Sequence, residues 1–218
     1  MILQHYYWCF ENALPPRICE DILNYGKSLK DEKARTYGTK QGDLSSYEEK
    51  KLEKKRNSNV VWMNDRWIYR EIQPYVNIAN KNAGWNYHWN WSESCQFTRY
   101  DGSKKGHYDW HTDSGKEINE GGNMRKLSMI IPLVDGNEYE GGDFEINLNN
   151  PENDNNIVSI KEAKIKGTII VFPSFVWHRV TPVTSGTRYS LVNWHRGRRF
   201  ESYKGVKRIQ RKSKEKRL

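Results

Sequence analysis

The chain has 218 residues, enough for one domain with a sizeable core and too few for two comfortable ones. Aromatic residues make up 13% of it, including nine Trp, so large rings can supply much of the buried area. The formal charge of +9 is concentrated at the end of the chain, because residues 204–218 hold eight Lys or Arg and one Glu. This tail is either a solvated extension or a weak polyanion-binding segment, and its spacing does not indicate a folded nucleic-acid module.

The location of the protein is constrained by what the sequence lacks. No apolar run is long enough for a transmembrane helix, and the first ten residues do not have the pattern of a secretory signal. The three cysteines, Cys9, Cys19 and Cys95, are far apart and form no CxxC pair, which is typical of reduced thiols. We therefore expect a cytoplasmic protein that does not contact a membrane.

The first third of the chain is expected to supply supporting helices. Pro15 and Pro16, followed by apolar residues at helical spacing, predict an amphipathic helix that ends near Leu29. A second helix is expected from residues 64–65 to Gly84. Between the two helices, residues 31–58 are polar and charged, and they predict either a lid over the site or a solvated insertion.

Short apolar or alternating runs, broken by Gly, Pro, Asn and Asp, dominate the rest of the chain. After a first short strand at 60–62, they predict eight strands, which are 86–91, 95–100, 127–134, 143–148, 157–160, 168–172, 176–180 and 188–194. Eight short strands at this spacing, preceded by helices, favour a mainly β sandwich or jelly roll.

The segment GHYDWHTD, residues 106–113, is the first concentration of metal-ligand residue types. Residues i and i+2 of a strand share a face, so His111 and Asp113 can present an imidazole and a carboxylate side by side. His107 and Asp109 form the same pattern with the same parity, and periodicity does not choose between the two pairs. One further imidazole would complete a 2-His-1-carboxylate site, which leaves coordination positions of Fe(II) open.

The segment FPSFVWHRVTPVTSGTRYSLVNW is the second concentration. His178 lies in an apolar run, and a turn with Pro and Gly separates it from Arg188 in the next predicted strand. We expect Arg188 beside His178 across an antiparallel pair. A buried arginine requires a carboxylate, which is either a protein side chain or one end of a bound dicarboxylate whose other end chelates the metal.

Three segments together, YDGSKKGHYDWHTD, EYEGGDF and HRVTPVTSGTRYSL, resemble the prolyl 4-hydroxylase branch of the iron(II)- and 2-oxoglutarate-dependent oxygenases. The resemblance covers roughly residues 56–195. It implies a mainly β (α+β) double-stranded β-helix, or jelly roll, with N-terminal supporting helices. We expect one oxygenase domain over 1–203, with a core at about 56–195, a candidate lid at 31–58 and a basic tail at 204–218.

The resemblance also implies roles for individual residues. The family spacing of Tyr, two residues, then His-x-Asp matches Tyr108, so the expected iron ligands are His111, Asp113 and His178. Arg188 is expected to bind the distal carboxylate of 2-oxoglutarate. Two cosubstrate-contacting tyrosines of the family are relevant: Tyr100 matches one of them, whereas Pro132 stands where related chains often carry the other.

The implied reaction is hydroxylation of a prolyl residue in a peptide or protein, with release of succinate and CO2. The cofactors are Fe(II), 2-oxoglutarate and dioxygen, and ascorbate is a possible reductant. The residues expected near the substrate are Trp194, Arg125 and Arg56. The alternative for Trp194 is a purely structural role in the core, which is common for a tryptophan in a strand.

Three other functions stay open at this point. A related oxygenase could act on another protein side chain. A nucleic-acid demethylase resembling the AlkB type would carry a second arginine six residues after Arg188, where this chain has Trp194, so we expect at most weak nucleic-acid contact through the tail. A non-catalytic jelly-roll module or a site for another metal would not require Arg188.

Overall fold

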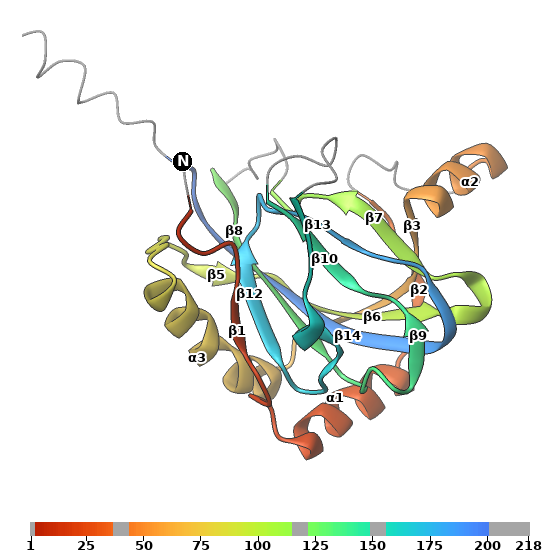
Figure 1. Cartoon of the computed structure of the whole chain (residues 1–218), viewed down its shortest axis with the longest axis horizontal. Helices are drawn as coiled ribbons and strands as arrows, with labels where there is room; N and C mark the ends of the chain where they lie inside the picture. The colour runs from red at the N-terminus through yellow and green to blue at the C-terminus, as the bar shows by residue number, and fades with distance from the viewer. Residues whose placement is uncertain (1–2, 37–43, 115–121, 149–155, 201–218) are drawn as a thin grey trace, which may run out of the picture.

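The structure is a computed structural model that describes residues 3–36, 44–114, 122–148 and 156–200. The basic tail 204–218 and residues 37–43 of the candidate lid lie outside the described residues. Two antiparallel β-sheets face each other, and the helices Pro16–Ser28 and Arg66–Asn82 cover the outer side of the larger sheet (Figure 1). The described part of the chain has no helix long and apolar enough to cross a membrane.

The larger sheet has nine strands, with the main order β1-β12-β8-β14-β6-β4-β2 and with β5 and β9 paired to β14. The long strand β14 is central, because it pairs with β8 on one side and β6 on the other. The strands are β1 (Trp8–Phe10), β2 (Glu32–Lys33), β4 (Asn59–Met63), β5 (Trp91–Ser92), β6 (Cys95–Asp101), β8 (Asn123–Pro132), β9 (Tyr139–Gly141), β12 (Ile169–Pro173) and β14 (Val183–Arg198).

The smaller sheet has the order β11-β10-β13-β7-β3. Its central strand β13 pairs with β10 on one side and with β7 on the other, and His178 lies directly opposite His111. The strands are β3 (Arg56–Asn57), β7 (His107–His111), β10 (Phe144–Asn147), β11 (Ile157–Ser159) and β13 (Trp177–Val180).

Strand alternation divides the core into two layers. Leu127, Met129 and Ile131 of β8 face the helices and join the first hydrophobic cluster. Ile130 faces the smaller sheet and joins the second cluster, and Ser128 on the same side reaches the candidate site. The helices are α1 (Pro16–Ser28), α2 (Ser46–Lys55) and α3 (Arg66–Asn82), with 3-10 turns at Gly102–Lys104 and Lys161–Lys164.

The predicted mainly β fold and both supporting helices are confirmed. The first helix begins with Pro16, and the second continues through Pro74 to Asn82, with Gly84 in a left-handed conformation just beyond. The predicted strand 86–91 is wrong over most of its length, because Asn86 has a φ of 51° and strand β5 starts only at Trp91.

The predicted pairing of the strands that carry His178 and Arg188 is also wrong. Strand β13 ends at Val180 in the smaller sheet, and β14 begins at Val183 in the larger sheet. Only Thr181 and Pro182 separate them, so the chain crosses between the sheets instead of making a hairpin. Gly186, which was expected in the turn, lies within β14 with a φ of 69°.

Candidate active site

Three potential metal ligands converge between the two sheets. One ligand atom from each of His111, Asp113 and His178 lies within 4.8 Å of the others. His111 is the last residue of β7, Asp113 follows two residues later, and His178 is on the neighbouring strand β13. The Nε2 atoms of His111 and His178 are 3.8 Å and 3.5 Å from the two carboxylate oxygens of Asp113.

Backbone carbonyls orient both imidazoles. The Nδ1 atom of His111 is 2.8 Å from the carbonyl oxygen of Asp109, and that of His178 is 2.9 Å from the carbonyl oxygen of Val176. A carbonyl oxygen can only accept, so each Nδ1 carries the hydrogen and donates it. Each Nε2 is therefore unprotonated and available to a metal ion near the Asp113 carboxylate, as in second-sphere support of metal-binding histidines.

The carboxylate of Asp113 is held in place and ionised. Its Oδ2 accepts a 2.7 Å hydrogen bond from the Ser128 hydroxyl, which also contacts the Ser174 hydroxyl at 2.9 Å. Burial raises the pKa of Asp113, but the adjacent His178 and His111 rings outweigh this effect and lower the pKa to about 2. Burial and the facing His178 hold the pKa of His111 well below its usual value. A carboxylate and a neutral imidazole are the forms that bind a metal ion.

A cavity of about 40 Å³ adjoins these three residues. Its wall also contains Tyr100, Tyr108 and Trp194, together with apolar side chains from both sheets. The ring of Tyr108 stacks on His111, with centroids 3.4 Å apart and an interplanar angle of 13°. A larger cleft of about 610 Å³ lies elsewhere on the protein and includes none of the three potential ligands. We assign the chemistry to the smaller cavity, because the donor atoms face it.

Arg188 is fully buried and lacks an anionic partner among the described residues. Its Nη1 is 3.3 Å from the Ser190 hydroxyl, whereas Nε and Nη2 are buried and find no hydrogen-bond partner in the described part of the chain. The guanidinium lies 5.3 Å from the centre of the Tyr100 ring, which lines the metal-site cavity. A buried cation with two unsatisfied donors fits a bound carboxylate, which would supply the missing charge and acceptors.

The EYEGGDF motif makes room for this arginine. Gly142 has a φ of 64°, and a Cβ atom there would lie 3.0 Å from Cδ of Arg188 and 2.8 Å from Cγ2 of Val183. A larger residue would therefore be strained and would press on the arginine. No side chain of the described residues replaces the absent anion, so the protein-carboxylate alternative for Arg188 lacks support here.

Trp194 forms the wall of the cavity away from Arg188. It is 5% exposed, its ring centre is 6.2 Å from that of the exposed Trp62, and its indole Nε1 has no partner among the described residues. The guanidinium of Arg125 stacks 3.8 Å from the ring centre of Trp194. The structure thus brings two of the predicted substrate residues, Trp194 and Arg125, together beside the cavity.

Glu93 is a partner of Arg125 that the sequence did not reveal. Its carboxylate accepts hydrogen bonds of 2.7 Å and 2.5 Å from Nε and Nη2 of Arg125, and it also pairs with Arg196. Its backbone N–H donates to the carbonyl of Trp194, and its carbonyl accepts from the side chain of Asn193. Glu93 therefore fixes both Arg125 and the strand that carries Trp194. Its partners are distant in the chain, and no local motif marks it.

The third predicted substrate residue, Arg56, is on strand β3 and is 5% exposed. It donates to the Ser58 hydroxyl at 2.9 Å and to Oε1 of Gln96 at 2.8 Å, and it lies 4.5 Å from the Tyr108 ring centre. These acceptors are neutral, and both Arg56 and Gln96 line the metal-site cavity.

His107 is separate from the potential metal cluster. Its ring nitrogens face the carbonyl oxygens of Lys105 and Lys54 at 2.8 Å and 3.1 Å.

The candidate lid is partly helical, with α2 capped by a capping box at Ser45. The end of the segment is anchored, because β3 pairs with β7. Movement of the segment stays a prediction.

Comparisons with known proteins agree with this geometry. Residues 95–196, just under half of the chain, match the 2OG-Fe(II) oxygenase superfamily. A PKHD-type hydroxylase from Synechococcus sp. (strain CC9311) is 38% identical over 104 residues, which are 46% of this chain and 39% of the relative. A PKHD-type hydroxylase from Azoarcus sp. (strain BH72) is 38% identical over 95 residues, which are 42% of this chain and 38% of that protein. The chain thus spans about two fifths of the length of these relatives.

Similar folds occur among solved structures. A Pseudomonas putida prolyl-4-hydroxylase superposes with a TM-score of 0.64 at 19% identity, covering 90% of this chain and 95% of that one. A viral collagen prolyl hydroxylase from Paramecium Bursaria Chlorella virus-1 gives a TM-score of 0.62 at 19% identity, covering 89% and 97%. Residues 95–196 therefore match the 2OG-Fe(II) oxygenase superfamily, and the chain shares its fold with the two prolyl hydroxylases.

Proposed function

We propose that this protein is an Fe(II)- and 2-oxoglutarate-dependent dioxygenase that hydroxylates a prolyl residue in a peptide or protein and releases succinate and CO2. The observation that carries the proposal is the combination of the His111, Asp113 and His178 cluster with the unsatisfied guanidinium of Arg188. The cluster offers three ligands and leaves coordination positions open, as Fe(II) oxygenases require. Arg188 supplies a receptor for a second carboxylate of the cosubstrate.

The protein groups have distinct roles in this proposal. His111 and His178 present their Nε2 lone pairs, and Asp113 supplies the anionic ligand while Ser128 fixes its orientation. Arg188 binds the distal carboxylate of 2-oxoglutarate over the Tyr100 ring. When bound, iron, 2-oxoglutarate and dioxygen supply the oxidising chemistry. The apolar walls of the cavity exclude water from it.

Trp194 and Arg56 line the cavity, and Trp62 and Arg125 lie against the Trp194 ring; this arrangement supports a peptide substrate. An indole ring offers a flat apolar surface to a prolyl ring, and Nη1 of Arg125 has no partner among the described residues, so it can donate to a peptide carbonyl. A proline-containing chain is already extended as polyproline II, so docking on aromatic rings costs little ordering entropy. One of the similar structures, from Trichoplax adhaerens, is a prolyl hydroxylase in complex with a peptide fragment of hypoxia inducible factor.

The oxygenase assignment is tested by incubating the purified chain with Fe(II), 2-oxoglutarate and a library of proline-containing peptides. Mass spectrometry should detect succinate that depends on iron, and one added oxygen in some of the peptides. Succinate formation without peptide oxidation would support the oxygenase but not the substrate. No iron-dependent succinate with any peptide would contradict the oxygenase assignment itself.

The prolyl assignment is tested separately with Trp194→Ala. Peptide hydroxylation should fall steeply, while uncoupled turnover of 2-oxoglutarate should survive, because Trp194 is not among the potential metal ligands or beside Arg188. Hydroxylation of prolyl peptides at the parent rate would show that Trp194 is only a core residue. Much better turnover of free amino acids or nucleobases would exclude peptidyl proline as the substrate.

A further inference from the structure

The 610 Å³ cleft described above lies outside the candidate active site, and no residue lines both cavities. It is formed by residues 86–90, by Lys126 at the start of β8, and by residues 197–200 at the end of β14. Tyr87, Trp89 and Phe200 contribute three aromatic rings to its wall. The Tyr87 and Phe200 rings touch edge to face, with centroids 5.0 Å apart.

Lys126 places a buried ammonium group at this cleft. The residue is 4% exposed, and its Nζ lies 3.2 Å from the centre of the Phe200 ring. Among the described residues it has neither an ion pair nor a side-chain hydrogen bond. Burial lowers the pKa of Lys126 to about 8, so keeping the charge costs stability near neutral pH. The ammonium group therefore lies over an aromatic ring but has no anionic partner among the described residues, and a bound anion would compensate its charge.

The remaining charges of the cleft have the same sign. Arg198 and Arg199 are exposed and form no ion pair with the described residues, and none of the ten residues that line the cleft is Asp or Glu. The cleft therefore combines flat rings with uncompensated positive charge.

We propose that this cleft binds single-stranded nucleic acid, with Tyr87, Trp89 and Phe200 contacting unstacked bases while Lys126, Arg198 and Arg199 contact phosphates. Rings interleaved with cations are the arrangement by which proteins hold single strands without reading their sequence. An acidic peptide would meet the charges but would make no use of the three aromatic rings that line the cleft. A duplex keeps its bases stacked, and so it cannot offer their faces to the rings.

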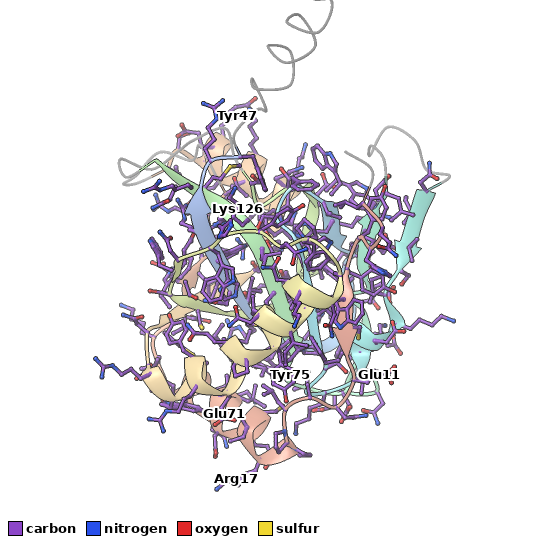
Figure 2. The ribbon with its side chains drawn as sticks, turned by 90° about the vertical axis from the view of Figure 1, so that its left-hand side faces the viewer. Glu11, Arg17, Tyr47, Glu71, Tyr75 and Lys126 are labelled. Atoms are coloured by element: carbon purple, nitrogen blue, oxygen red, sulfur yellow. The ribbon has the colours of Figure 1, made fainter. Side chains whose placement is uncertain are left out.

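The test uses the full chain and a fluorescein-labelled oligouridylate RNA of about 12 nucleotides, within the usual site size of single-strand binders. Binding is measured by fluorescence anisotropy at several salt concentrations. The Arg198→Gln/Arg199→Gln double variant is compared with Arg17→Gln/Arg70→Gln, which has the same net charge and the same tail. The control arginines are exposed, and Figure 2 shows Arg17 at the end of the molecule away from Lys126.

The cleft double variant should bind about tenfold or more weakly, and its log–log salt slope should shrink by about 1.4, or 0.7 for each lost phosphate contact. The control double variant should stay within about twofold of the parent. Tyr87→Leu should weaken binding about fivefold without changing the salt slope, because stacking releases no counterions. Lys126→Met should weaken binding while leaving iron-dependent 2-oxoglutarate turnover unchanged.

Two results would overturn the proposal. Equal loss in the two double variants would show that RNA is held by overall charge and not by the cleft. Displacement of the RNA by polyglutamate at equal charge concentration, together with no effect of Tyr87→Leu, would show that the cleft receives an acidic protein. Circular dichroism melting of each variant checks that the fold is retained.

Discussion

Replacement of Arg188 by Met tests the cosubstrate site most directly. The substitution keeps an unbranched apolar side chain and removes a buried guanidinium whose Nε and Nη2 have no partner among the described residues. Truncating one member of a buried charge pair typically costs about 2–5 kcal/mol. At about 1.4 kcal/mol for each factor of ten, the affinity for 2-oxoglutarate should fall by roughly 30-fold to several thousand-fold.

The effect on stability should have the opposite sign. Without 2-oxoglutarate the parent protein carries an unpaired buried cation, so Arg188→Met should be at least as stable as the parent. 2-Oxoglutarate at about 100 times the Kd of the parent should stabilise the parent by about 2.7 kcal/mol and the variant by less than about 1 kcal/mol. Thermal melting with and without 2-oxoglutarate, in the presence of Mn²⁺ to fill the metal site, measures both effects.

Arg99→Met is the matched control, because Arg99 already pairs with Asp31 at 3.0 Å in a partly exposed position. Loss of such a pair should cost no more than about 1 kcal/mol and should leave the binding of 2-oxoglutarate intact. An unchanged affinity in Arg188→Met would remove Arg188 from the cosubstrate site. A strongly destabilised Arg188→Met in the absence of 2-oxoglutarate would show that the fold itself satisfies the guanidinium.

Four further predictions follow from the site and its surroundings. His111→Ala should abolish iron binding measured by metal analysis, whereas His107→Ala should keep most of it; the reverse result would move the site to the first His-x-Asp. Glu93→Gln removes the carboxylate that Arg125 and Arg196 share, so it should lower the free energy of unfolding in urea by about 3 kcal/mol. It should also raise the peptide KM more than it lowers uncoupled 2-oxoglutarate turnover. An unchanged peptide KM would make Glu93 purely structural. Burial lowers the pKa of His195 to about 3, so as the pH falls below about 6.5 the unfolded chain takes up a proton on this residue before the folded protein does, and the free energy of unfolding decreases. In His195→Gln, the free energy of unfolding measured by urea titration should depend less on pH. An unchanged pH profile would contradict the assignment. Limited proteolysis should cut within residues 31–58 first and should be suppressed when metal, 2-oxoglutarate and peptide are added together; equal cutting would indicate a passive insertion.

Part of the candidate site could be predicted because its signal is local. His111 and Asp113 are two residues apart, although the choice of this pair over His107 and Asp109 came from the family resemblance. Ser128, which bonds to Asp113, was not predicted. Glu93 could not be predicted, because its charge partners Arg125 and Arg196 are 32 and 103 residues away. The contact of Glu93 with these two arginines depends on how β14 packs against its neighbouring strands, and the periodicity of the sequence does not predict that packing.

The fold shows the same division between local and long-range information. The helices and long strands carry clear periodicity, whereas β1, β2 and β3 have only two or three residues each and show no alternation. The sheet in which each strand lies is a long-range choice. Strand β13 hydrogen-bonds to β10 on one side and to β7 on the other, so it has no free edge for β14 and the expected hairpin between His178 and Arg188 does not form.

The crossing at Thr181 and Pro182 bears on the mechanics of the two sheets. His178 belongs to the smaller sheet and Arg188 to the larger one, so a molecule held by both would connect the two layers across the core. Such a molecule would act as a removable crosslink between the two sheets, in addition to the hydrogen bonds from Ser128 to Asp113 and from Arg56 to Gln96. When the cosubstrate is bound, the amide hydrogens of β13 and β14 should both exchange more slowly with solvent. The two sheets would then open as one cooperative unit.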